Sequence, residues 1–405
     1  MYLAESDVVI VGVGPTGLSA ALAVARSGRT AVVIDAGEDQ SVGSRAITIH
    51  AGTLRVLEQL GCVDRILAEA GKISAMQTRT PRSVLSTARF DSLPGKYAFA
   101  ATLPQTRTQA LLRLSAEEAG VRFLPGRAAG IEQDDGGATV ALEGGATVRG
   151  RFVIGADGMH SAVRAAVGIG YADTGGSRGD DENMVLADVV PSGPVDRSQA
   201  IFLTGRRGVL GLVPLPLGRL RVIANLAEGD RADTVEAVQR LVDERLQHRS
   251  HNGRLRIEEV VWATRFRFRH HLAESFRAGR VLLAGDAGHV HSPAGGQGMN
   301  LGIRDAWYLA STLAAALAAE DAGRPDEVVS LLDAYSANRR AAAAKVIEAT
   351  NQIGRVMFVP MPLRPFLHLA FRAASVAGAS EKQALALSGI LDTGPSTLLE
   401  AAQVH

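Results

Sequence analysis

Short apolar runs near the N-terminus alternate with a segment of small residues. Residues 7–12 read DVVIVG and residues 30–37 read TAVVIDAG, which is the pattern of strands buried on both faces of a sheet. Between them, LSAALAVARSG at 18–28 predicts a helix that ends at Gly28. A strand, a helix and a second strand in this order predict a βαβ unit and a parallel sheet.

Two later apolar runs resemble further strands of the same sheet. They read GRFVIGADG at 150–158 and GRVLLAGDAG at 279–288. Between them, residues 182–226 hold short apolar stretches separated by turn residues, which indicates antiparallel sheet. The predicted fold class is α/β, with a Rossmann-like parallel sheet interrupted by a β-rich antiparallel domain. Residues 326–353 add a segment of strong helical propensity.

Composition narrows the class of protein. The 405 residues are 46% hydrophobic and 21% charged, which is typical of a globular chain. The net charge of +1 gives no electrostatic case for a nucleic-acid partner. Cys62 is the only cysteine, which excludes an internal disulfide and a dithiol redox mechanism and favours a cytoplasmic location. The apolar run at 356–371 carries prolines, Arg364 and His368, so no membrane span is predicted.

The segment GVGPTG at 12–17 follows a predicted strand and opens a predicted helix. In this context Gly12 allows a tight turn, Gly14 lets a pyrophosphate approach the backbone, and Gly17 allows close packing of helix and strand. Asp35 ends the next strand, where its carboxylate would accept from a ribose hydroxyl. A dinucleotide site is the prediction, and a purely structural turn is the alternative. The chain has no second glycine fingerprint, so we expect one such site.

Two further segments end predicted strands. In GADGMHSAVR at 155–164, Asp157 is either a cofactor ligand or the cap of an ordinary turn. In GDAGHVHSPAGGQGMNLGIRDA at 285–306, Asp286 would accept from a sugar or ribitol hydroxyl. The glycines at 295–298 leave a bare backbone path where a helix begins, which favours a ligand with partial negative charge.

The last of these segments also holds two histidines, His289 and His291, which by residue type suit a metal site. We expect them to point in opposite directions along an extended segment, and no nearby cysteine or glutamate completes a site. No metal is therefore predicted.

Residues 12–17, 155–158 and 285–306 together resemble the three fingerprints of group A FAD-dependent aromatic monooxygenases, the p-hydroxybenzoate hydroxylase-like family. The resemblance runs over roughly residues 5–350, and the subset that acts on aromatic polyketides is the most similar. It implies non-covalent FAD and NAD(P)H as a transient reductant. It also implies that O₂ forms a flavin C4a-hydroperoxide, which hydroxylates a bulky aromatic substrate.

The resemblance also assigns individual roles. Arg45 matches the arginine near the FAD pyrophosphate, Gln105 the glutamine beside the ribitol and isoalloxazine, and Asp286 the aspartate on the ribityl chain. A surface salt bridge is the alternative for Arg45, and a helix cap for Gln105. The candidate catalytic groups are the backbone atoms of Pro293, Gly295 and Gly296. The predicted cofactor-binding residues are Gly12, Gly14, Pro15, Thr16, Gly17, Asp35, Arg45, Gln105, Asp157, Asp286, Pro293, Gly296, Gly298, Met299 and Asn300.

The domains follow from this resemblance. The predicted FAD-binding domain is discontinuous and comprises residues 1–75, 98–175 and 272–350. Residues 76–97 and 176–271 form the predicted substrate domain. Residues 351–405 form a predicted helical tail, and we expect no thioredoxin-like domain.

The substrate is predicted to be a large, mostly neutral aromatic, because GVLGLVPLPLG at 208–218 is apolar. The predicted substrate contacts are Phe202, Leu212 and Pro214. The run VVWATRFRFR at 260–269 alternates apolar and basic positions. Its arginines at 265, 267 and 269 either form the solvated face of an edge strand or bind the phosphates of NADPH.

Two other classes of function stay open. A flavoprotein reductase or dehydrogenase would use the same fold, and a non-catalytic protein would bind FAD without oxidising NAD(P)H. Within the monooxygenase class, the sequence does not choose among hydroxylation, Baeyer–Villiger insertion and oxidative decarboxylation. It does not choose between NADH and NADPH, nor does it give the oligomeric state.

Overall fold

The computed structural model describes residues 2–37, 45–175, 183–205, 207–226, 232–246, 254–267, 269–357 and 379–392. Phe268, Arg206 and most of the predicted tail lie outside these residues.

A parallel sheet forms the first layer of the molecule. Its main path runs in the order β19-β20-β11-β1-β2-β8, and β9 and β10 extend it as a hairpin beside β11. The strands are β1 (Tyr2–Val11), β2 (Ala31–Asp35), β8 (Arg122–Pro125), β9 (Ala128–Asp134), β10 (Gly137–Leu142), β11 (Thr147–Gly155), β19 (Arg277–Ala278) and β20 (Val281–Leu283). β1 pairs in parallel with both β2 and β11, and β11 pairs in parallel with β20. All four apolar runs predicted as sheet strands therefore lie in this sheet.

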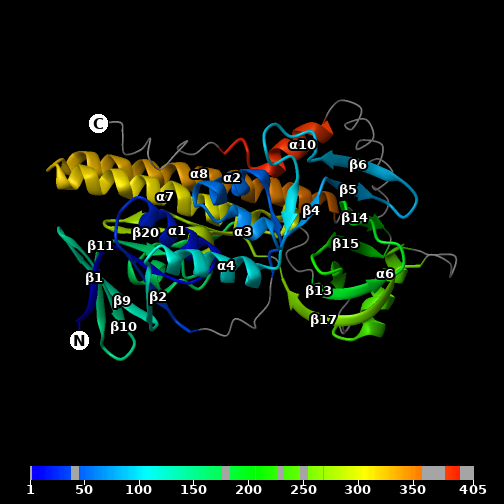
Figure 1. The fold of residues 1–405 in the computed structure, drawn as a ribbon, viewed down its shortest axis with the longest axis horizontal. Coiled ribbons are helices and arrows are strands. Elements are labelled where there is room, and N and C mark those ends of the chain that lie inside the picture. Colours follow the sequence, from blue (N-terminus) through cyan, green and yellow to red (C-terminus); the bar gives the residue numbers. More distant parts are fainter. Residues whose placement is uncertain are drawn as a thin grey trace.

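Helices cover this sheet, and two of them run side by side along the length of the molecule (Figure 1). These two are α7 (Gln297–Asp321) and α8 (Pro325–Met357). The others that pack on the domain are α1 (Pro15–Arg26), α2 (Ala51–Gln59), α3 (Val63–Leu67), α4 (Gln105–Glu118) and α5 (Ala162–Ala166). α1 packs closely on α7, because Gly302 leaves space for the Thr16 side chain.

A second, mostly antiparallel sheet lies at one end of the molecule (Figure 1). Its order is β17-β13-β16-β15-β14-β5-β6, and only the β14–β5 pair is parallel. The strands are β5 (Ala75–Arg79), β6 (Val84–Arg89), β13 (Asn183–Ser192), β14 (Gln199–Gly205), β15 (Gly208–Pro214), β16 (Leu220–Leu226) and β17 (Arg256–Phe266). Helix α6 (Val235–Leu246) packs against it and closes a second hydrophobic core.

Small sheets and short helices join the large layers. The remaining elements are β3 (Thr48–Ile49), β4 (Gly71–Ile73), β7 (Ala100–Thr102), β12 (Tyr171–Asp173), β18 (His271–Ala273), β21 (His289–Val290), η1 (Gly285–Ala287), η2 (Ala294–Gly296) and α10 (Ala379–Ser388). The α/β fold with a parallel sheet and a separate antiparallel sheet is confirmed. The predicted strand at 260–269 begins earlier, at Arg256, and ends at Phe266. Across the described residues, no helix is long and apolar enough to cross a bilayer.

Candidate active site

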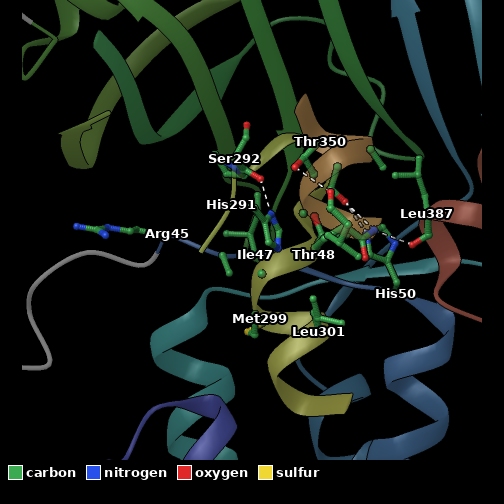
Figure 2. Close-up of a pocket in the computed structure, with 18 of the residues that line it drawn as sticks. Arg45, Ile47, Thr48, His50, His291, Ser292, Met299, Leu301, Thr350 and Leu387 are labelled. Atoms are coloured by element: carbon green, nitrogen blue, oxygen red, sulfur yellow. Dashed lines mark hydrogen bonds between the residues drawn. The ribbon is translucent and has the colours of Figure 1, made fainter. Parts of the chain in front are cut away.

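One large cavity, of about 1750 Å³, lies between the carboxyl ends of the parallel strands and the second sheet. Its wall includes the glycine loop after β1, the loop after β20, the start of α7 and the inner face of the second sheet. Figure 2 shows part of this wall around the start of α7.

The three glycines of the first loop divide into two kinds. A Cβ on Gly12 would lie 2.4 Å from the Ala156 carbonyl oxygen, and one on Gly17 would lie 2.1 Å from the Gly12 carbonyl oxygen. Both glycines are thus required by the packing of β1, α1 and β11. A Cβ on Gly14 would meet no atom within 4 Å, and Gly14 lines the cavity with Pro15 and Thr16. This open cradle at a helix N-terminus fits a pyrophosphate.

The predicted ribose ligand, Asp35, stands at the end of β2 but does not line the cavity. Its Oδ2 accepts from Arg113 Nη1 at 2.6 Å, and its Oδ1 accepts from the Gly37 N–H at 2.9 Å. The ion pair with Arg113 fixes the carboxylate and leaves it half-buried at the domain surface.

Gln105 and Arg45 both line the cavity. Gln105 is the first residue of α4, and its Oε1 accepts from the Ala46 N–H at 3.1 Å, so it holds the segment that follows Arg45. The Arg45 side chain is exposed and lies apart from the other labelled residues in Figure 2. The Arg45 carbonyl accepts from Arg221 Nη1 at 3.1 Å, which ties this segment to the second sheet.

Asp157 has the structural role that the sequence left as the alternative. Its carboxylate accepts from the Ser161 hydroxyl and from the Val163 N–H, at the start of α5. It does not line the cavity, whereas its neighbours Met159 and His160 do. The assignment of Asp157 to the cofactor is therefore not supported by its position, because its oxygens are directed to the helix.

Sequence reasoning missed Arg164 and Tyr171, which support the loop of the third fingerprint. Arg164 Nη1 donates to the Ala287 carbonyl at 2.9 Å, and its guanidinium lies 3.7 Å above the Tyr171 ring. The Tyr171 hydroxyl donates to the Asp286 carbonyl at 2.8 Å. Arg164 belongs to the GADGMHSAVR segment, so its spacing from Asp157 was the available signal.

Asp286 lines the cavity as predicted. Its side chain is accessible from within the cavity but is surrounded by protein, and this burial raises the pKa of the carboxyl. Such a carboxylate gains stability from hydroxyl donors on a bound ligand.

The glycine turn, Pro293–Gly296, ends at the start of α7. Gly295 and Gly296 have φ values of 78° and 66°, a left-handed conformation that favours glycine. The N–H groups in the first turn of α7 have no acceptor within the helix, and Gly298 and Met299 line the cavity there. A Cβ on Gly298 would meet no atom within 4 Å. The helix dipole and the open backbone suit a ligand edge with negative charge.

His50, which sequence reasoning missed, clamps this turn. Its Nε2–H donates to the Gly295 carbonyl at 2.8 Å, and burial lowers the pKa of His50 to about 4. Asn300 is buried and bonds the same two segments, because its Oδ1 accepts from the His50 N–H and its Nδ2 donates to the carbonyls of Thr48 and Gly296. Asn300 does not line the cavity, so its contacts make it a clamp of the turn.

The two histidines of the third fingerprint do not point in opposite directions. Side chains two positions apart on an extended chain share a side, and the rings of His289 and His291 stack with centroids 6.2 Å apart. His289 Nε2 bonds Asp305 Oδ2 at 2.6 Å, and Arg339 Nε donates to Asp305 Oδ1 at 2.8 Å. The Arg339 charge helps lower the pKa of the buried Asp305 to about 2, against the desolvation that raises it. In the described part of the chain, no cluster of histidine, cysteine and acidic residues suits a metal ion.

The inner face of the second sheet is apolar, and Phe202 lines the cavity as predicted. Leu212 does not, because it lies in the second hydrophobic core with its side chain on the opposite face of β15. Pro214 does not line the cavity either. Val213, which lies between Leu212 and Pro214 in the sequence, lines it instead. Arg265, Arg267 and Arg269 lie on the cavity wall with exposed side chains.

Comparison with known proteins shows the family to which this chain is similar. The model of one protein family, described as an FAD binding domain, matches residues 5–350. A rifampicin monooxygenase from Streptomyces venezuelae is 33% identical over 355 residues, which cover 85% of this chain and 70% of that protein.

Two solved structures are similar in fold. The anhydrotetracycline hydroxylase OxyS from Streptomyces rimosus matches with a TM-score of 0.77 and 29% identity, covering 96% of this chain and 77% of that one. A ternary complex of aklavinone-11 hydroxylase with FAD and aklavinone matches with a TM-score of 0.71 and 26% identity, covering 86% of this chain and 68% of that one.

Proposed function

The chain belongs to this FAD-binding family, and we propose that it is an FAD-dependent monooxygenase that hydroxylates a bulky aromatic, polyketide-like metabolite with NAD(P)H and O₂. The family match confirms the resemblance expected from the three fingerprints and the FAD cofactor. The activities named for the relatives support the substrate class, since a rifampicin, an anhydrotetracycline and an aklavinone enzyme are among them.

One observation carries the proposal. The open cradle at Gly14, the Asp286 carboxylate and the N-terminus of α7 line the same cavity as the apolar face around Phe202. The residues proposed to hold FAD and the apolar residues proposed to hold the substrate therefore line one cavity, which suits an oxygen-transfer enzyme.

The residues that would hold FAD follow from their chemistry. Gly14, Pro15 and Thr16 would hold the pyrophosphate on the N-terminus of α1, and Asp286 would accept from the ribityl hydroxyls. The first-turn N–H groups of α7 would face the pyrimidine edge of the ring. Bound FAD supplies the two-electron chemistry that activates O₂.

The chain's own residues prepare the chamber. Met76, Val213 and Ile223 line it with Phe202, and these side chains exclude water from the reacting centre. His50 and His291 border the glycine turn and are neutral near pH 7, because burial lowers the pKa of each to about 4. Neither histidine therefore adds a positive charge at this border near pH 7.

NAD(P)H is proposed to reach the cavity through its basic margin. Arg265, Arg267 and Arg269 line the wall on the edge strand β17 and just beyond it, with side chains open to solvent. Guanidinium groups bind phosphates in bidentate fashion, which suits a nicotinamide dinucleotide that enters and leaves. The chain carries one glycine fingerprint, which supports transient docking over a second Rossmann site.

The test is NAD(P)H oxidation by the purified holoenzyme, with and without hydroxylated polycyclic aromatics, in air and under nitrogen. We expect oxidation that aromatic compounds stimulate, and one ¹⁸O atom in the product under ¹⁸O₂. Equal turnover of NAD(P)H without O₂, with a reduced organic product, would instead indicate the reductase. Bound FAD with no stimulation by any aromatic would indicate a non-catalytic protein.

A further inference from the structure

The segment 379–392, which we call the strap, comprises α10 and the four residues after it. It belongs to the part of the sequence predicted as a simple helical tail. Figure 1 shows α10 beside β6, at the edge of the second sheet. Six strap residues nevertheless line the cavity, namely Gln383, Ala386, Leu387, Gly389, Leu391 and Asp392.

Leu387 covers the glycine turn. A Cβ on Gly295 would lie 2.8 Å from Leu387 Cδ2, so the leucine methyl group rests on the bare Cα of that glycine. Gln297 Nε2 donates to the Leu387 carbonyl at 2.9 Å, which fixes the strap backbone to the first residue of α7. Figure 2 shows Leu387 on the side of the turn where His50 also lies.

The strap is anchored at both ends. Near its start, the Ser86 hydroxyl of β6 donates to Gln383 Oε1 at 3.2 Å. Near its end, Arg304 Nη1 donates to the Gly389 carbonyl at 3.1 Å, and Arg339 forms two bonds of 2.8 and 3.1 Å with the Asp392 carboxylate. Burial lowers the pKa of Arg304, and the nearby Asp392 charge opposes this effect. These hydrogen bonds hold the strap in place as part of the cavity wall.

Leu391 is the second apolar side chain that the strap presents to the cavity. It is 65% exposed and lines the cavity. An apolar side chain on a cavity wall gains stability when an apolar ligand covers it. Leu387 and Leu391 are four positions apart, and both contribute to the wall on the strap side of the glycine turn.

We propose that Leu387 and Leu391 set the size of the ring system that the enzyme accepts. The strap closes the substrate chamber beside the glycine turn, and these two side chains limit how far a fused aromatic system extends past the reacting carbon. The inference rests on the proposed function, because it takes the occupant of this chamber to be an aromatic substrate.

The experiment compares ligand binding to the holoenzyme and to Leu387→Ala and Leu391→Ala. The probes are a naphthol, an anthracenol and a hydroxylated tetracene, titrated in the absence of NAD(P)H and followed by the change in flavin absorbance. Leu114→Ala is the matched control, since Leu114 is an exposed leucine on α4 that does not line the cavity. FAD affinity and the unfolding temperature are measured for every variant.

We expect each strap variant to shift the ratio of tetracene to naphthol affinity by about tenfold toward the larger ring, the usual effect of opening an apolar pocket. FAD affinity of Leu391→Ala should stay within about twofold, and Leu114→Ala should match the wild type. Unchanged ratios in both strap variants, with FAD retained, would overturn the role of the strap. If Leu387→Ala fails to fold, the affinity ratio of Leu391→Ala alone decides the test. If no probe binds the wild-type holoenzyme, the proposed function fails and the inference with it.

Discussion

The three glycines of the first fingerprint are glycine for different physical reasons. Gly12 and Gly17 lie where the protein itself would clash with a Cβ, at 2.4 and 2.1 Å from carbonyl oxygens. Gly14 lies against open space on the cavity wall. Gly12 and Gly17 are thus required by the fold, whereas the fold alone does not require a glycine at position 14.

This difference gives a paired prediction. Gly14→Val should leave the unfolding temperature close to that of the wild type but weaken FAD binding by about a hundredfold or more, because the side chain enters the phosphate cradle. Gly17→Ala should destabilise the apoprotein by about 1–3 kcal/mol or more, because the Cβ pushes α1 away from β1. Thermal unfolding and FAD fluorescence titration measure both effects. A Gly14→Val protein that binds FAD normally would contradict the assigned cradle.

Asp286 gives a second prediction for a single residue. Asp286→Asn removes the charge but keeps the size, and we expect FAD to bind about 10–100-fold more weakly through the loss of roughly 1.5–3 kcal/mol of charge-assisted hydrogen bonding. Asp333→Asn is the control, since Asp333 pairs with Arg277 on the surface. Equal FAD affinity in the two variants would show that Asp286 has no part in binding.

Some of these residues were predictable from sequence and others were not. Gly12, Gly14 and Gly17 were, because their motif joins β1 to α1 and is contiguous in the chain, although the Ala156 carbonyl that a Cβ on Gly12 would meet is distant in sequence. Asp157 was not, because an aspartate before a short helix fits a ligand and a cap equally well. His50 was not, because its partner Gly295 is 245 positions away in the sequence.

At the scale of elements, the glycine turn is the point where distant segments meet. Residues 293–300 are bonded to β3, to the residue before α2 and to the strap. Because α7 begins here, the clamp also sets the direction of the first N–H groups of that helix.

The clamp predicts the behaviour of His50 variants. His50→Leu leaves the Gly295 carbonyl with only the longer contact from Gln297 Nε2 at 3.3 Å. We expect FAD affinity to fall about tenfold and the midpoint potential of the bound flavin to change, because one buried hydrogen bond is lost and the turn relaxes. His50→Gln keeps an Nε2–H donor and should recover most of both properties. Similar loss in the two variants would mean that ring packing, and not the bond, is what matters.

The success of the strand predictions depended on whether the sequence pattern shows which faces of a strand are buried. The four parallel strands were visible because each is apolar on both faces. Because β15 is apolar throughout, no alternation of polar and apolar residues indicated which face meets the cavity. Leu212 was predicted to contact the substrate, whereas Val213 is the residue that lines the cavity. β5 pairs with β14, which comes more than a hundred positions later in the sequence, and no local pattern indicates this pairing.

For the whole molecule, buried titratable groups set the response to acid. Burial lowers the pKa of His50 and His291 from 6.5 to about 4, so the folded protein keeps them neutral where the unfolded chain binds protons. The free energy of unfolding should therefore fall as the pH drops from about 6.5 to 4, by about 1.4 kcal/mol per unit for each histidine. Asp305, with its pKa lowered to about 2, adds a further loss between about pH 4 and 2.

Guanidinium unfolding at several pH values measures this slope. The double variant His50→Gln/His291→Gln should be flatter than the wild type between about pH 6.5 and 4, while His160→Gln, at an exposed position, should not differ. An unchanged slope in the double variant would place the proton uptake elsewhere.

The order of the parallel sheet has a consequence for how the protein is made. The loop that holds Gly14 leaves the ribosome early, but β1 has no partner on its far side until β11 is synthesised. The last residues of β11 have none there until β20 is synthesised, because β10 pairs only with the first part of β11. The start of α7 and the strap follow later still. Contacts this distant in sequence form slowly, and a nascent chain must wait with apolar strand edges unpaired. FAD uptake should therefore come late, after the start of α7 has been synthesised and has folded against the sheet.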